Sequence, residues 1–235
     1  MNQLAQLKVE LQQSITIPQE KQAYFFKTGT GQYAEHDTFI GVTNPTLRIL
    51  AKKYATLPLE DIQTLIESPV NEERLLALLI AIHQYQKPTL HTKDEIYLFY
   101  LGNMQYVNNW NLVDASAHLI LGAHIDTTDK NILLSLAQSD SLWERRIAIV
   151  ATWHFIRKNQ LEWTTTIAAM LLNDRHDLIH KAVGWMLREA GKRDQQVLIQ
   201  FLDKYATTMP RTMLRYSIER LPEQLKKHYL QKTKS

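Results

Sequence analysis

The chain of 235 residues contains no cysteine, which excludes disulfides, cysteine-bound metals and thiol chemistry. Glycine and proline are scarce, with seven of each, and no proline occurs between Pro88 and Pro210. Long stretches are therefore free to be helical. The longest strongly apolar run, Leu75 to Ile82, is far shorter than a bilayer span. The first residues also lack a basic segment followed by an apolar one, so we expect a cytoplasmic protein with no membrane partner.

The net charge of +3 is small, but the charges are unevenly distributed. Residues 1–139 carry 10 Lys and Arg against 14 Asp and Glu, whereas residues 140–235 carry 17 against 10. The basic second part could offer a surface to phosphates. Scattered cations that only keep the helix exteriors solvated would explain the same counts.

The spacing of apolar residues predicts an all-α fold. Almost no segment alternates with period two, whereas the run from Leu75 to Ile82 has helical periodicity, as does the series Leu112, Ala115, Leu119 and Gly122. Helix start signals recur at about 35 residues or twice that, at residues 68–73, 139–144, 173–177 and 208–211. Helix pairs with this period predict an α-solenoid of HEAT-like pairs, curved with a concave face, in a single domain over residues 1–235. A non-repeating helical bundle is the alternative.

One segment departs from the helical pattern. Gly29 and Gly31 lie two apart in it, but the dinucleotide fingerprint and the P-loop lysine are absent. We expect a structured loop that leads to a helix start at Asn44-Pro45. The unpaired backbone N–H groups of that helix start could face an anion.

The segment from His176 to His180 places two histidines four residues apart, as zinc proteases do. Asp177 is shorter than the usual glutamate, and no third ligand is spaced to match. We expect Asp174 or Asp177 to cap a helix here instead. We see no reason to invoke a metal or an organic cofactor.

Trp110 and Asp114 lie four residues apart, which places ring and carboxylate on one face of a helix. Leu112, Ala115 and Leu119 supply a different, apolar face. A hydrogen bond to the preceding helix or an arginine partner would explain the carboxylate, and a lone tryptophan is more often core than site.

Two further helices carry candidate residues. Arg145 and Arg146 are adjacent and point about 100° apart, so only one of them can share a face with the other site residues. Gly184 precedes Trp185 inside a helix, where glycine costs about 1 kcal/mol relative to alanine and usually signals close packing. If all three helices line the concave side, two indoles, a carboxylate and an arginine converge.

Several segments jointly carry a resemblance to a known family. They are FFKTGTGQYAEHDTFIGVTNPTLRILAKKY, EERLLALLI, VNNWNLVDASA, LWERRIAIV, LIHKAVGWMLREAGKRD and MPRTMLRYSIERLP. Together they run from about residue 24 to residue 222 and resemble the AlkD-like family of DNA alkylation repair proteins, which are HEAT-like-repeat DNA glycosylases. The resemblance implies hydrolysis of the N-glycosidic bond of N3- and N7-alkylpurines, as a monofunctional enzyme of base excision repair.

The same resemblance implies roles for individual residues. Asp114 resembles the catalytic aspartate, and Trp110 and Trp185 resemble the two indoles that flank the deoxyribose of the lesion. Arg146 resembles the arginine beside the DNA backbone. The further DNA contacts implied are Tyr33, Pro45 and Arg48. We also expect Arg188 to line the concave face as a DNA contact. Where the best-known members read Gln-Thr-Pro, this chain reads Thr-Asn-Pro at residues 43–45.

The implied partner is duplex DNA that contains alkylated purines. We expect the protein to bind it as a monomer with access to the nucleoid. Two alternatives remain open. A catalytically silent relative would bind DNA without releasing bases. A HEAT-like protein–protein scaffold would instead have an apolar or acidic concave face, rather than one lined by Arg146, Arg188 and neighbouring lysines.

Overall fold

The computed structural model describes residues 2–88 and 90–232. Within these residues every regular element is a helix, apart from an isolated bridge between Thr38 and Val70. The all-α prediction is therefore confirmed. The chain divides into two compact units, one ending at Ser116 and the other beginning at Ala117. No helix in the described ranges is both long enough and apolar enough to cross a membrane.

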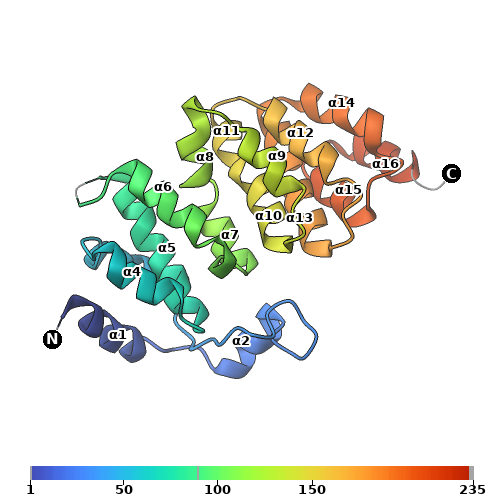
Figure 1. Ribbon diagram of the computed structural model, residues 1–235. Coiled ribbons are helices and arrows are strands. Elements are labelled where there is room, and N and C mark those ends of the chain that lie inside the picture. Colours follow the sequence, from blue (N-terminus) through green and yellow to red (C-terminus); the bar gives the residue numbers. More distant parts are fainter. Residues whose placement is uncertain (1, 89, 233–235) are drawn as a thin grey trace. The chain divides into compact units, whose positions relative to one another are not determined.

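The first unit is built around one long buried helix, α5 (Figure 1). This helix packs against α3, α4, α6 and α7 and is buried on all sides from Asn71 to Ile82. A helix buried around its whole circumference has no polar stripe, which explains its unbroken apolar run. The elements are α1 (Gln3–Gln13), α2 (Gln19–Phe26), α3 (Asn44–Lys53), α4 (Leu59–Ile66), α5 (Asn71–Gln86), α6 (Lys93–Gly102), the 3-10 helix η1 (Met104–Tyr106) and α7 (Trp110–Ser116).

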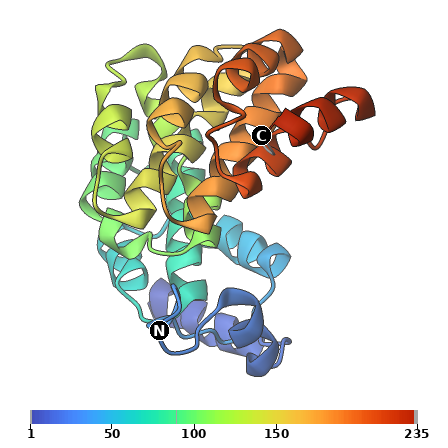
Figure 2. The same cartoon turned by 90° about the vertical axis from the view of Figure 1, so that its right-hand side faces the viewer.

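In the second unit α13 is the central helix, and it packs against α10, α12, α14 and α15 (Figures 1 and 2). The elements are α8 (Leu121–His124), the 3-10 helix η2 (Ile125–Thr127), α9 (Asn131–Ala137), α10 (Leu142–Ala151), α11 (Trp153–Arg157), α12 (Glu162–Met170), α13 (Asp177–Arg193), α14 (Gln195–Tyr205), α15 (Arg211–Ser217) and α16 (Glu223–Lys232).

Two of the predicted helix starts are confirmed in detail. The helix α3 begins at Asn44 with Pro45 in its first turn, and the Thr43 hydroxyl accepts a hydrogen bond from the Thr46 N–H at 3.4 Å. The Ser141 hydroxyl caps α10 in the same way, accepting from the Glu144 N–H. Both caps satisfy N–H groups that have no partner inside the helix.

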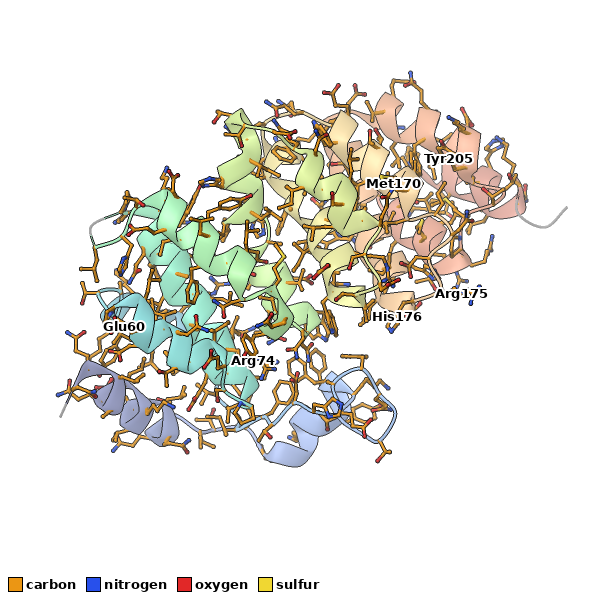
Figure 3. The ribbon with its side chains drawn as sticks, viewed as in Figure 1. Glu60, Arg74, Met170, Arg175, His176 and Tyr205 are labelled. Atoms are coloured by element: carbon orange, nitrogen blue, oxygen red, sulfur yellow. The ribbon has the colours of Figure 1, made fainter. Side chains whose placement is uncertain are left out.

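The predicted cap of α13 is wrong. Its N-cap is His176 (labelled in Figure 3), whose ring Nδ1 accepts from the Leu178 N–H at 3.2 Å. Burial lowers the pKa of His176 and so favours the neutral ring, which alone has an acceptor nitrogen. Asp174 lies two residues before His176, and its carboxylate accepts a hydrogen bond from the His176 N–H at 2.8 Å.

The helix predicted to run past Leu119 is shorter than expected, since α7 ends at Ser116 and α8 begins only at Leu121. The Ser116 hydroxyl donates to the Leu112 carbonyl at 2.7 Å and lies 3.2 Å from the Tyr100 hydroxyl. A serine that bonds back to its own helix competes with the backbone and favours a bend or an end.

The glycine inside α13 marks a close helix crossing, as the sequence predicts. A Cβ atom at Gly184 would lie 2.5 Å from the Tyr216 Cβ and 2.6 Å from the Met213 carbonyl oxygen. The α15 backbone therefore approaches α13 at a distance that only glycine allows.

We expect Gly184→Ala to destabilise the protein by about 1–3 kcal/mol, because the added methyl group must push α15 away. Gly102→Ala is the matched control, since nothing lies within 4 Å of a Cβ atom at that helix position. The control should be neutral or slightly stabilising. Denaturant unfolding of both variants measures the difference, and equal stabilities would contradict the close crossing.

Candidate functional site

Trp110, the first residue of α7, lies in an aromatic stack. Its ring stacks on Phe26 with centroids 5.2 Å apart and an interplanar angle of 16°, and Phe26 in turn stacks on Phe39 at 4.2 Å. The indole Nε1–H donates to the Tyr33 hydroxyl at 3.1 Å. The stack and this hydrogen bond together set the orientation of the half-buried indole.

Asp114 is half-buried and lies one turn after Trp110 in the same helix. Leu112, Val113 and Ser116 of α7 are buried in the unit. The carboxylate thus stands at the boundary between core and solvent, where water screens its field less than at a fully exposed position.

The loop between α2 and α3 is fastened through Asp37 to α5 and to the residue before α7. Its carboxylate forms an ion pair with Arg74 of α5 (labelled in Figure 3), with both side chains only 4% exposed. The same carboxylate accepts from Asn109 Nδ2 at 2.6 Å and from Asn71 Nδ2 at 3.1 Å. Asn111 Nδ2 donates to the Asn71 side-chain oxygen at 2.7 Å. Asn109 and Asn111 flank Trp110 in the chain, so this network positions both ends of the Trp110 backbone segment.

Sequence reasoning missed Asp37, because nothing local connects it to Arg74 or Asn109. The asparagine-rich run around Trp110 is the signal that could have indicated a buried polar network. The loop itself is structured as predicted, since the Gly31 N–H donates to Glu35 at 2.7 Å and the Gly29 N–H to Gln32 at 3.1 Å.

The N-terminus of α3 borders a cavity of about 510 Å³ in the first unit. Its walls are mostly apolar and aromatic, with Asn71 and Asn111 among the polar lining residues. Pro45 lines this cavity and is exposed, and Arg48 is exposed one turn later on α3. Of the predicted DNA contacts in this unit, Pro45 and Arg48 are thus accessible, whereas Tyr33 is half-buried against Trp110.

In the second unit the adjacent arginines of α10 have different environments, as their helical spacing predicts. Arg145 Nε donates to Asp174 at 2.6 Å, and its guanidinium also binds the carbonyls of Ser139 and Asp140. Arg146 is buried and donates to the Leu178 carbonyl in the first turn of α13. Arg145 is therefore committed to the loop before α13, and Arg146 joins α10 to α13 itself.

Trp185 of α13 is half-buried and contacts a second tryptophan that sequence reasoning missed. The Trp153 ring centroid lies 5.0 Å from that of Trp185 in an edge-on arrangement, and the His118 ring centroid lies 4.5 Å from that of Trp153. This aromatic row restricts the orientation of the Trp185 indole. The residues come from three separate segments, so no local pattern indicates the row.

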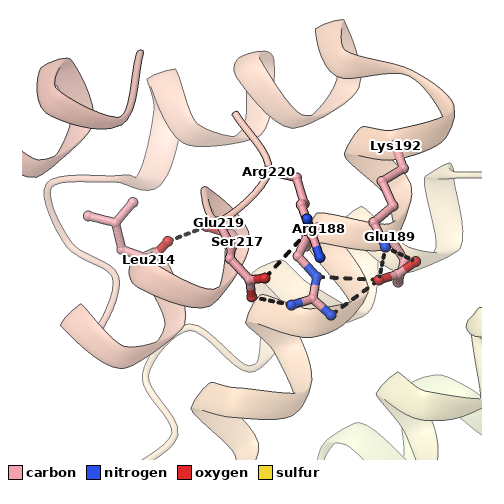
Figure 4. A network of polar contacts seen from close by, with 7 residues as sticks. All are labelled: Arg188, Glu189, Lys192, Leu214, Ser217, Glu219 and Arg220. Carbon is pink, nitrogen blue, oxygen red and sulfur yellow. Dashed lines mark hydrogen bonds and ion pairs between the residues drawn. The ribbon is translucent and has the colours of Figure 1, made fainter. Parts of the chain in front are cut away.

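Arg188 lies one turn after Trp185 and is paired with two carboxylates (Figure 4). It contacts Glu189 at 3.3 Å and forms a closer pair with Glu219 beyond α15. Glu189 is also contacted by Lys192 at 2.7 Å. These pairs offset most of the positive charge that the sequence assigns to Arg188 as a DNA contact.

The two histidines of the zinc-like pattern contact the turn before α13. His176 caps this helix, and His180 Nε2 lies 2.6 Å from the Asp174 carbonyl oxygen. Across the part of the chain that the structure describes, no three His, Cys, Asp or Glu side chains gather as a metal site would require.

Comparisons with known proteins agree with this fold. A family model described as DNA alkylation repair enzyme matches residues 12–221. Among solved structures, a predicted DNA alkylation repair enzyme from Enterococcus faecalis is similar to the chain with a TM-score of 0.67 and 19% identity, over 87% of this chain and 95% of the other. At this identity the structural likeness shows the fold alone. No curated protein sequence matches.

We expect Asp37→Asn to destabilise the first unit by about 3–5 kcal/mol, because it leaves the Arg74 guanidinium buried without its counter-charge. Denaturant unfolding followed by circular dichroism measures the loss.

The matched control is Glu10→Gln, which removes the charge of a surface pair with Lys53 but keeps a side-chain oxygen that can accept from the Tyr54 hydroxyl. Exposed pairs contribute little to stability, so this variant should unfold almost like the wild type. If the two variants lose the same stability, the Asp37 network does not anchor the loop.

Proposed function

Since the chain belongs to the DNA alkylation repair enzyme family, we propose that it is a DNA glycosylase that hydrolyses the N-glycosidic bond of cationic N3- and N7-alkylpurines in duplex DNA. The observation that carries the proposal is the family match over residues 12–221, a range that contains every candidate site residue. The half-buried carboxylate of Asp114 on α7 supports it, because this chemistry needs a fixed negative charge.

The reaction asks little of a general acid. Alkylation at N3 or N7 makes the purine a cationic leaving group, so the bond to the sugar is already weakened. Departure of the base leaves positive charge on the deoxyribose, as in other glycoside hydrolyses. In this proposal the Asp114 carboxylate stabilises that charge electrostatically and orients the water that attacks the sugar.

The aromatic residues have a matching role in the proposal. The face of Trp110 that does not stack on Phe26 and a face of Trp185 attract a positively charged sugar through cation–π interaction, worth about 0.5–2 kcal/mol each. The contacts that set each indole support this, since Tyr33 holds one and Trp153 the other. Fixed rings lose little entropy when the sugar binds.

The remaining residues are proposed to contact the DNA backbone. Arg146 is almost fully buried and donates to the Leu178 carbonyl, and we propose that it holds a phosphate as well, which sets the position of the duplex rather than reads its sequence. Tyr33, Pro45, Arg48 and Arg188 complete the proposed DNA contacts. The same proposal includes an α-solenoid of HEAT-like helix pairs with a concave DNA-binding face. In it, the protein acts as a cytoplasmic monomer in base excision repair and requires no cofactor.

We expect Asp114→Asn to lower base release by at least about a hundredfold while leaving DNA affinity nearly unchanged, because the carboxylate acts mainly in the transition state. The measurement is release of 7-methylguanine and 3-methyladenine from methylated duplex DNA, without added metal, by purified wild type and variant.

Asp129→Asn is the matched control, since it removes one exposed carboxylate outside the candidate site. It should release bases like the wild type. Release by Asp114→Asn at the wild-type rate would refute the assignment. DNA binding without release by either protein would leave a catalytically silent relative or an enzyme for another adduct.

Arg146→Ala should weaken DNA binding and flatten its dependence on salt, with the slope of log K against log salt falling by about 0.9 for one lost phosphate contact. Arg145→Ala provides the comparison, because its guanidinium is committed to Asp174 and should contribute no phosphate contact. Fluorescence anisotropy over a potassium chloride series measures both slopes. Equal slopes for the two variants would remove Arg146 from the proposed interface.

A further inference from the structure

A second cavity, of about 350 Å³, lies beside the aromatic row of the second unit. Trp153, which contacts the Trp185 ring, forms one wall. The other lining residues are Ile156, Arg157, Glu189, Lys192 and Arg193. The cavity thus joins an aromatic and apolar wall to a group of cations, all within one unit.

Arg157 is held in place by the aromatic wall. Its guanidinium carbon lies 4.8 Å from the centroid of the Trp153 ring, at the distance of a cation–π contact. Trp153 is itself fixed by Trp185 and His118. An arginine supported in this way is exposed to solvent yet restricted in direction, so it loses less side-chain entropy when it binds an anion.

Glu189, the only carboxylate among the described residues that line the cavity, is already neutralised. Glu189 is contacted by Arg188 at 3.3 Å and by Lys192 at 2.7 Å (Figure 4). In contrast, no carboxylate within the described residues forms an ion pair with Arg157 or Arg193, and both side chains are exposed. The cavity therefore keeps positive charge that is not compensated inside the unit.

We propose that this cavity binds a phosphodiester group of the DNA backbone, with Arg157 and Arg193 as its cationic ligands. Guanidinium groups match phosphate oxygens through paired N–H donors, and Trp153 and Ile156 offer an apolar surface to the adjoining sugar. The choice of DNA as the source of the phosphate rests on the proposed function. Trp153 lines the cavity and its ring contacts Trp185, so the phosphate would be held near the nucleotide that Trp185 is proposed to flank.

This assignment differs from the cation on α13 that the sequence favours as a DNA contact. Arg188 is the more obvious candidate because it follows Trp185 by one turn, but it is engaged by Glu189 and Glu219. Arg157 lies on a different helix, α11, and lines the cavity because α11 packs against α13.

The test measures binding of an unmodified DNA duplex to the full-length protein by fluorescence anisotropy across a salt series. Each of Arg157→Gln and Arg193→Gln should lower the salt slope by about 0.9 and weaken binding roughly eightfold at about 0.1 M salt, and the double variant should show both losses. Arg157→Lys should keep the slope. Lys227→Gln, on an exposed site of α16 outside the cavity, is the charge-matched control and should leave the slope unchanged.

The outcomes separate this inference from the proposed function. Loss of slope in the double variant supports the phosphate contact even where the wild type releases no base. An unchanged slope in a wild type that does release 7-methylguanine overturns the contact and leaves the glycosylase intact. Failure of the wild type to bind DNA overturns both. If inorganic phosphate raises the thermal stability of the wild type but not of the double variant, while both bind DNA equally, the cavity takes free phosphate and the DNA assignment is wrong.

Discussion

Both side chains of the ion pair between Asp37 and Arg74 are buried, and the surroundings of Trp110 depend on this pair. A carboxylate removed from water needs several donors, and Asp37 finds them on α5 and beside α7. The loop that carries Asp37 also carries Tyr33, which accepts the indole N–H of Trp110. The loop therefore cannot shift without breaking contacts at several points, and the indole is held in one orientation.

A buried ion pair of this kind contributes orientation more than stability. The desolvation of both charges consumes most of their attraction, so a well-packed apolar pair could be as stable. Apolar groups, however, have no directional preference and would not fix Asn109 next to Trp110. For a reaction in which charge develops on a sugar, a preorganised environment matters because groups that must first rearrange stabilise the transition state less.

Local rules predict the elements of this fold well. The helix start at Asn44-Pro45, the Ser141 cap and the close crossing at Gly184 each follow from a few neighbouring residues, and all three are confirmed. The errors arise where a side chain competes with the local rule. His176 caps α13 because burial favours its neutral ring, and α7 ends where Ser116 bonds back to its own helix.

The candidate site is harder to predict, since its supporting contacts join residues far apart in the sequence. Helical spacing correctly places Asp114 one turn from Trp110, but it contains no information about Asp37, 72 residues before Asn109. Trp153 is invisible for the same reason, because only the packing of α11 against α13 brings it to Trp185.

The sequence is least informative about which positive charges remain available to an anion. The sequence counts Arg145, Arg188 and Arg157 as equal cations, yet the fold pairs the first two with carboxylates and stacks the third on an indole. What an anion meets is the charge that internal partners do not offset, and this quantity depends on packing. A basic composition therefore indicates a polyanion partner only after the internal ion pairs have been subtracted.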